Sequence, residues 1–190
     1  MKRGLVSLSV AILFVLQLSQ GEAFAQRWSI ATNVVDYLNM GTLNVESSVA
    51  VAQHYSFNAG VRYNPWTFHY GNEDKQFENR KKCMYAGLRY WPWHIYSGWW
   101  AGLQLQYQEY NRGGWLIQHA EEGDAYGLGL SLGYTLMLHK SFNIEFGASA
   151  WAGAAVYTAY SCPYCGKIVD QGSKFFLWPN NVMVSLVYIL

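Results

Sequence analysis

Large apolar residues alternate with small or polar residues along positions 126–138 of the chain. The even positions carry tyrosine or leucine, whereas the odd positions carry glycine, serine, threonine and one methionine. Side chains alternate between the two faces of a β-strand, so this pattern predicts one long strand; it excludes a helix, whose apolar positions recur every three to four residues. A face of glycine and serine indicates crowding inside a closed barrel, with the leucine and tyrosine side chains turned outward.

Seven further stretches alternate in the same way, which gives eight predicted strands: 28–35, 42–51, 55–64, 84–90, 99–110, 126–138, 142–157 and 182–190. The connections between them are short near residue 54, at 91–97 and at 139–140, and long at 66–82, 111–123 and 161–173. Only the short link at 36–41 departs from this alternation. Short turns on one rim and long loops on the other are typical of outer-membrane barrels. The prediction is an all-β, eight-stranded antiparallel up-and-down transmembrane β-barrel.

The first 25 residues have the features of a secretory signal peptide. Lys2 and Arg3 precede the apolar run 5–18, and Ala23-Phe24-Ala25 supplies a cleavage site of small residues. We therefore expect a barrel domain at 26–190, in the outer membrane of a Gram-negative bacterium. Cleavage leaves eleven basic and eleven acidic side chains, a balance that gives no electrostatic case for nucleic acid. No stretch of 26–190 offers the roughly twenty apolar residues of a membrane helix.

Aromatic residues gather where membrane interfaces are expected. Trp91, Trp93, Tyr96, Trp99 and Trp100 flank one predicted short turn, on the periplasmic side. At the outer side, four loop side chains are expected to contact a partner: Trp66, Phe68, Tyr70 and Trp115. The alternative is a soluble periplasmic barrel that binds a ligand, as lipocalins do. Such a barrel would turn its large residues inward, and its outer face would be charged and poor in glycine, unlike the polar face found here.

Four charged residues lie on the predicted inner face: Glu46, Arg62, Arg89 and Glu145. If the hairpin near residue 54 is centred on His54, Glu46 and Arg62 lie opposite each other on adjacent strands. Arg89 and Glu145 are at similar distances from their short turns, so they share a level and can meet across the lumen. The interior of an eight-stranded barrel is just wide enough for side chains. We expect these charges to plug the lumen; a small-solute channel is the alternative.

Cysteines form the sharpest local motif, Cys162-Pro163-Tyr164-Cys165-Gly166. Two cysteines at this spacing resemble the knuckle of zinc ribbons, and Cys83 with His69 or His119 would complete a zinc site with Cys162 and Cys165. A Cys162–Cys165 disulfide is the favoured alternative in an exported protein. Free thiols in a reducing habitat are the third.

Catalysis is not predicted, and neither is any cofactor. Outer-membrane enzymes that modify lipid need a serine or histidine with an acid at the barrel rim. His119 precedes Glu121 and Glu122, but no serine on a strand is clearly partnered with it.

Together with the eight strands, the segments 63–68 (Tyr-Asn-Pro-Trp-Thr-Phe), 88–91 (Leu-Arg-Tyr-Trp) and 162–166 resemble a family of small outer-membrane barrels of unknown function from anaerobic gut-type Gram-negative bacteria. The resemblance covers nearly all of the chain after the signal peptide. The architecture is also similar to the OmpA/OmpX-type membrane domain. Members of the family are often encoded near surface-fimbria genes. The resemblance thus implies a structural or surface-interaction role, with membrane lipid and a surface or fimbrial protein as partners, and no established reaction.

Overall fold

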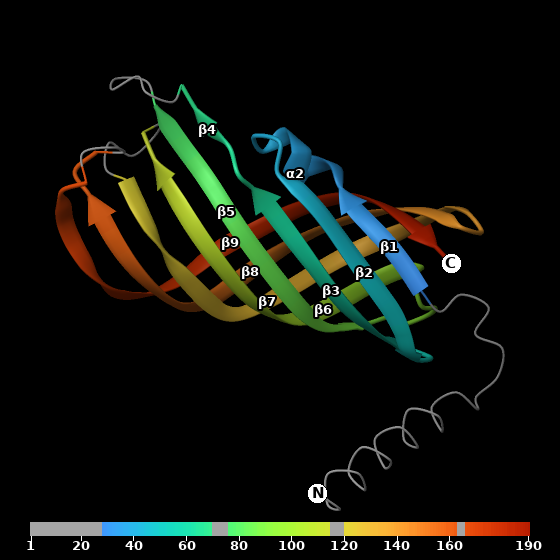
Figure 1. Cartoon of the computed structure of the whole chain (residues 1–190). Coiled ribbons are helices and arrows are strands. Elements are labelled where there is room, and N and C mark those ends of the chain that lie inside the picture. Colours follow the sequence, from blue (N-terminus) through green and yellow to red (C-terminus); the bar gives the residue numbers. More distant parts are fainter. Residues whose placement is uncertain (1–27, 70–75, 115–119, 163–165) are drawn as a thin grey trace, which may run out of the picture.

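The computed structural model describes residues 28–69, 76–114, 120–162 and 166–190 (Figure 1). Its elements in chain order are β1 Trp28–Asn33, α2 Val34–Leu38, β2 Leu43–Ala52, β3 Tyr55–Asn64, β4 Thr67–Phe68, β5 Phe77–Tyr90, β6 Gly98–Gly113, β7 Ala120–His139, β8 Phe142–Tyr160 and β9 Ile168–Ile189. Within these ranges, no helix is both long and apolar enough to span a membrane. The predicted signal peptide lies outside the described residues.

Eight of the strands form a closed antiparallel ring. Each of β1, β2, β3, β5, β6, β7, β8 and β9 pairs with the next, and β9 pairs back with β1, from Ser29 opposite Ile189 to Asn33 opposite Ser185. The two-residue strand β4 pairs with β5 and stands outside this ring. The prediction of an all-β, up-and-down ring of eight strands is therefore confirmed, and we refer to it below as the barrel.

The predicted orientation of the two strand faces is also confirmed. Leu128, Leu130 and Leu132 are more than half exposed on the outside, whereas the intervening Ser131 is buried. The inward glycines make room for large side chains from other positions in the ring: a Cβ atom at Gly133 would overlap the indole of Trp100. Small residues face the lumen because their neighbours fill it.

Outward-facing apolar residues form a continuous band around the barrel. This apolar belt lies between Tyr63 and Tyr126 on one side and Tyr55 and Tyr134 on the other, and it includes Phe57, Val61, Met84, Leu88, Leu103, Leu105, Leu128, Leu130 and Leu132. Charged residues begin directly beyond it, where Lys82 pairs with Glu109 (3.0 Å) on the outer surface. At the loop end, the belt is thus bounded by tyrosines with charge directly beyond them, whereas at the turn end the exposed Leu136 and Leu138 continue past Tyr134 on β7.

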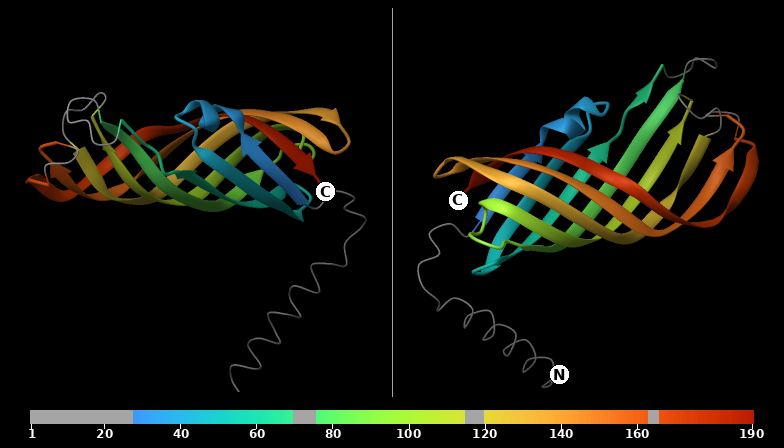
Figure 2. Two further views of the ribbon diagram at one scale, coloured as in Figure 1. Left: turned by 45° about the horizontal axis from the view of Figure 1, so that its top comes forward. Right: turned by 180° about the vertical axis from the view of Figure 1, so that it is seen from behind.

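The two rims of the barrel differ. At the turn end, short turns follow β2, β5 and β7, and the amide of Leu190 donates to the carbonyl of Trp28 (2.8 Å). At the loop end, α2 connects β1 to β2. Figures 1 and 2 show β7, β8 and β9 projecting well past α2, so the wall is much taller on that side of the barrel.

Several predicted strand boundaries are wrong. The last strand begins at Ile168 rather than at residue 182, and the first ends at Asn33, where α2 begins. Consecutive large residues at 175–178 hide the alternation of β9. The register with β8 also shifts, because Ser149 faces Asn181 and Ala150 faces Pro179, which leaves Asn180 as an extra residue. Such a bulge accommodates a proline that has no N–H to donate.

Candidate functional site

An aromatic cluster fills the barrel at its turn end. Trp91, Tyr96 and Trp100 are buried there together with Met183, Val187 and Ile189. The Trp91 indole N–H donates to Ser56 Oγ (3.0 Å), and its ring meets Tyr96 edge-on at 5.7 Å between centroids. The prediction that these three aromatic residues flank a membrane interface is therefore wrong. The link at 91–97 folds inward instead, and of the five predicted residues only Trp93 and Trp99 are well exposed.

A buried ionic network occupies the lumen next to this cluster. Arg89 lies between two carboxylates, with Nη2 2.7 Å from Glu46 Oε1 and Nη1 3.2 Å from Glu145 Oε1. The Tyr85 hydroxyl donates to Glu46 (2.8 Å) and the Thr135 hydroxyl donates to Glu145 (3.2 Å). The contact expected between Arg89 and Glu145 is thus present. The guanidinium also lies 4.2 Å from the ring of Trp100, which joins the network to the aromatic cluster.

The predicted pairing of Glu46 with Arg62 is wrong. The register between β2 and β3 places Asn44 opposite Arg62 and Glu46 opposite Gly60, two residues away from the predicted pairing. The turn pairs Ala52 with Tyr55 and is not centred on His54, which shifts the pairing by one residue, and the bulge between Ala50 and Ala52 shifts it by one more. Arg62 instead pairs with Asp36 of α2, at 3.5 Å between Nε and Oδ2, and both side chains are buried.

Sequence reasoning missed Asp36, which helix α2 carries into the barrel. The signal available was Asn33, whose side chain caps α2 by accepting from the amide of Val35 (3.2 Å). Asparagine before a short run with an acidic residue in its first turn is a helix-start pattern.

Little space remains around these charges. The cavity bounded by Glu46, Arg62 and Arg89 has a volume of about 20 Å³, which is room for about one water molecule. The barrel is therefore filled with side chains at this level.

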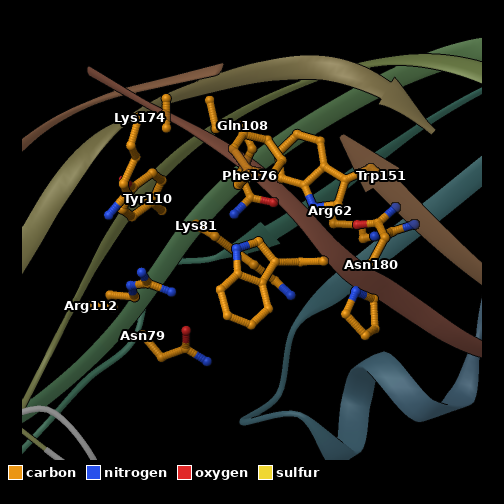
Figure 3. Close-up of a pocket in the computed structure, with 14 residues that line it drawn as sticks. Arg62, Asn79, Lys81, Gln108, Tyr110, Arg112, Trp151, Lys174, Phe176 and Asn180 are labelled. Carbon is orange, nitrogen blue, oxygen red and sulfur yellow. The ribbon is translucent and has the colours of Figure 1, made fainter. Parts of the chain in front are cut away.

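A larger cavity opens between this network and the loop end (Figure 3). This vestibule has a volume of about 360 Å³. It is lined by four cations, Arg62, Lys81, Arg112 and Lys174, and by the aromatic side chains of Trp151, Phe176 and Trp178. Apart from Arg62, none of these residues was predicted from the sequence to belong to a site. They come from strands far apart in the chain, and several lie in stretches predicted as loops.

Glu121 lies at the rim of the vestibule, beyond the apolar belt, and binds three neighbouring side chains. One of its oxygens accepts from Lys174 (2.7 Å), Tyr110 (2.7 Å) and Arg112 (3.3 Å). Partial burial by itself would raise the pKa of Glu121, but the hydrogen bonds from Lys174 and Tyr110 and the charge of Arg112 outweigh it and hold the pKa below the ordinary value. This carboxylate therefore stays ionised, and binds both cations, until the pH falls through that lowered pKa.

Replacing Lys174 with methionine is expected to raise the pKa of Glu121 toward its ordinary value, because the hydrogen bond and the charge of the ammonium are lost. The measurement is a pH titration of the carboxyl ¹³C resonance of Glu121 in the purified, folded barrel. Lys82→Met serves as the control, since Lys82 pairs with Glu109 on the outer surface. An unchanged pKa in Lys174→Met would contradict this account of the rim.

Two of the four predicted loop contacts lie in the described part of the chain. Trp66 is about half exposed, and its indole N–H donates to the carbonyl of Gly41 (3.2 Å). Phe68 stacks on Phe77, with 4.6 Å between ring centroids. Both side chains thus also hold the loop end together. Tyr70 and Trp115 lie outside the described residues.

The cysteines differ in chemical state. Cys83 is a free thiol buried inside the barrel, whereas Cys162 is disulfide-bonded. Cys165 lies outside the described residues, so its pairing with Cys162 stays a prediction, as does a metal site that includes it. Among the residues that the structure places, no three His, Cys, Asp or Glu side chains gather in a group that could hold a metal ion.

Comparisons with known proteins give one match. No curated protein matches the chain, and no solved structure does. A family model described as "Protein of unknown function (DUF3575)" matches residues 9–190, which is nearly the whole chain. The chain therefore belongs to the DUF3575 family of proteins of unknown function.

Proposed function

We propose that this protein is an integral outer-membrane β-barrel with a closed lumen and a structural or surface-interaction role. The apolar belt is the observation that carries the proposal. Leu128, Leu130 and Leu132 stand side by side on the outer surface, while the charges lie inside. A soluble protein rarely exposes an apolar surface this extensive, whereas a barrel that spans a bilayer needs an apolar outer surface.

The height of the belt supports a location in a bilayer. Tyr126 and Tyr134 are separated by eight residue steps on one strand, and so are Tyr55 and Tyr63. At about 3.3 Å per residue this is about 26 Å along the strand, or about 20 Å along the axis of a barrel whose strands tilt by about 40°. The aromatic rings at both edges add their own width. The belt thus approaches the apolar band of about 25 Å of outer-membrane barrels, which aromatic girdles also flank.

The filled interior favours a structural or binding role over conduction or catalysis. Arg89 is compensated by Glu46 and Glu145, and the space beside them is of the order of one water molecule. At the loop end, the taller wall of β7, β8 and β9 and the exposed Trp66 offer surface to a partner. We propose that the belt contacts membrane lipid and that the loop end contacts a surface or fimbrial protein.

Heat-modifiability tests the proposal. The full chain, produced in a Gram-negative host, is expected to be recovered from outer membranes and to migrate faster on a gel when unboiled than when boiled. A chain that begins at Gln26 is the control for export, and it should not reach the membrane. Recovery in the soluble periplasmic fraction with no mobility shift would contradict the proposal and favour a ligand-binding periplasmic barrel.

A further inference from the structure

The vestibule holds more positive charge than its ion pairs neutralise. Arg62 is paired with Asp36, while Arg112 and Lys174 share Glu121. In the part of the chain that the structure describes, the Lys81 ammonium has no ion pair and no hydrogen bond. Four cations therefore share two carboxylates as ion-pair partners. The adjoining network of Arg89, Glu46 and Glu145 carries one net negative charge, so one positive charge remains in excess.

This excess is held in a confined space. The Arg62 side chain is only 7% exposed, Lys81 is half-buried, and both line the cavity. Desolvated charge is unfavourable unless it is paired. An anion placed between Arg62 and Lys81 would supply the missing charge through charge-assisted hydrogen bonds, which are about twice as strong as neutral ones.

The cavity is lined by cationic side chains from one pair of strands and by aromatic side chains from another. Arg62 and Lys81 come from β3 and β5, whereas Trp151 and Phe176 come from β8 and β9 (Figure 3). Trp151 and Phe176 pack together at 4.5 Å between ring centroids. Aromatic side chains contribute apolar surface for the flat face of a ring. The vestibule thus joins an anion-binding side to a ring-binding side.

We propose that the vestibule binds a small organic anion in which one carboxylate or phosphate is attached to a ring. Lys81 and Arg62 bind the acidic group, and the ring lies against Trp151 and Phe176. The Gln108 amide, which lines the cavity and has no side-chain hydrogen bond among the described residues, is available to a ring substituent. A volume of about 360 Å³ lies within the usual range of small-molecule sites, about 300–1,000 Å³. The site depends on the cavity and not on the membrane location proposed above.

Calorimetric titration of the folded barrel in nonionic detergent tests the proposal with four probes: glucuronate, benzoate, glucose and acetate. One glucuronate or one benzoate is expected to bind per barrel, more weakly as salt is added. If glucuronate binds more tightly, the site is suited to an acidic sugar; if benzoate binds more tightly, it is suited to an aromatic acid. Glucose lacks the charge and acetate lacks the ring, so both should bind at least about tenfold more weakly, which is about 1.4 kcal/mol.

Two neighbouring lysines provide a matched pair of variants. Lys81→Gln is expected to weaken binding of the ring anion about tenfold. Lys82→Gln should leave it unchanged, because Lys82 points to the outer surface and pairs with Glu109. Phe176→Leu tests the ring side, with a loss of similar size expected, and the comparison of glucuronate with glucose tests the acidic side on the unaltered protein. The proposal would be overturned if neither glucuronate nor benzoate binds, or if glucose binds as tightly as glucuronate. It would also be overturned if Lys81→Gln and Lys82→Gln lose the same amount of affinity.

Discussion

Replacing Arg89 with methionine is expected to destabilise the barrel by about 3–5 kcal/mol, since this is the usual effect of removing one partner from a buried ion pair. The substitution keeps an unbranched side chain of moderate size, but it leaves Glu46 and Glu145 facing each other in the filled lumen without the cation between them. It also removes the guanidinium from the ring of Trp100. The measurement is the urea dependence of the folded fraction, read as the unboiled band on a gel.

The same network provides the controls. Adding Glu46→Gln and Glu145→Gln to Arg89→Met should restore much of the lost stability, because replacing a whole buried ion pair by neutral groups is often tolerated. Lys82→Met removes only an exposed pair and should change the free energy of unfolding by less than about 1 kcal/mol. If Arg89→Met is no more harmful than Lys82→Met, the buried network does not stabilise the barrel.

The fold was predictable because strand alternation is a local property. Along 126–138, the alternation of large apolar and small residues shows which face of the strand each residue lies on. Counting the stretches that alternate in this way predicts eight strands. The register was not predictable in the same way. The bulge at 50–52 shifts β2 against β3 by one residue, and the one at Asn180 changes the phase of the alternation along β9. Bulges depend on pairing with the neighbouring strand, so a single segment does not show them.

The candidate site shows the same limit. Arg89 and Glu145 were predicted to meet because each lies at a similar distance from a short turn, a quantity that the sequence contains. Asp36 was missed because it enters the barrel on α2, which interrupts the alternation. The vestibule was missed because Lys81, Trp151 and Phe176 converge only through the closure and stagger of the ring.

Leu130 provides the most direct test of what surrounds the barrel. It lies midway between Tyr126 and Tyr134, and its neighbours in register, Leu103 and Ala150, are also apolar. In a bilayer, Leu130→Arg is expected to destabilise the barrel by about 2–4 kcal/mol, because the charge lies near the midplane. In a water-soluble barrel, the same change at a side chain that is 65% exposed would be within about 0.5 kcal/mol.

Val169→Arg is the matched control, since Val169 is also exposed and apolar but lies on β9 beyond the belt. Both variants are to be unfolded in urea after insertion into phospholipid vesicles, with tryptophan fluorescence as the readout. A large loss of unfolding free energy in Leu130→Arg, with little change in Val169→Arg, would show that the effect depends on depth in the membrane. A packing defect in the barrel would not follow depth in this way. Small and equal losses at both positions would mean that lipid does not cover the belt, and the leucines would then need another explanation, such as a protein partner.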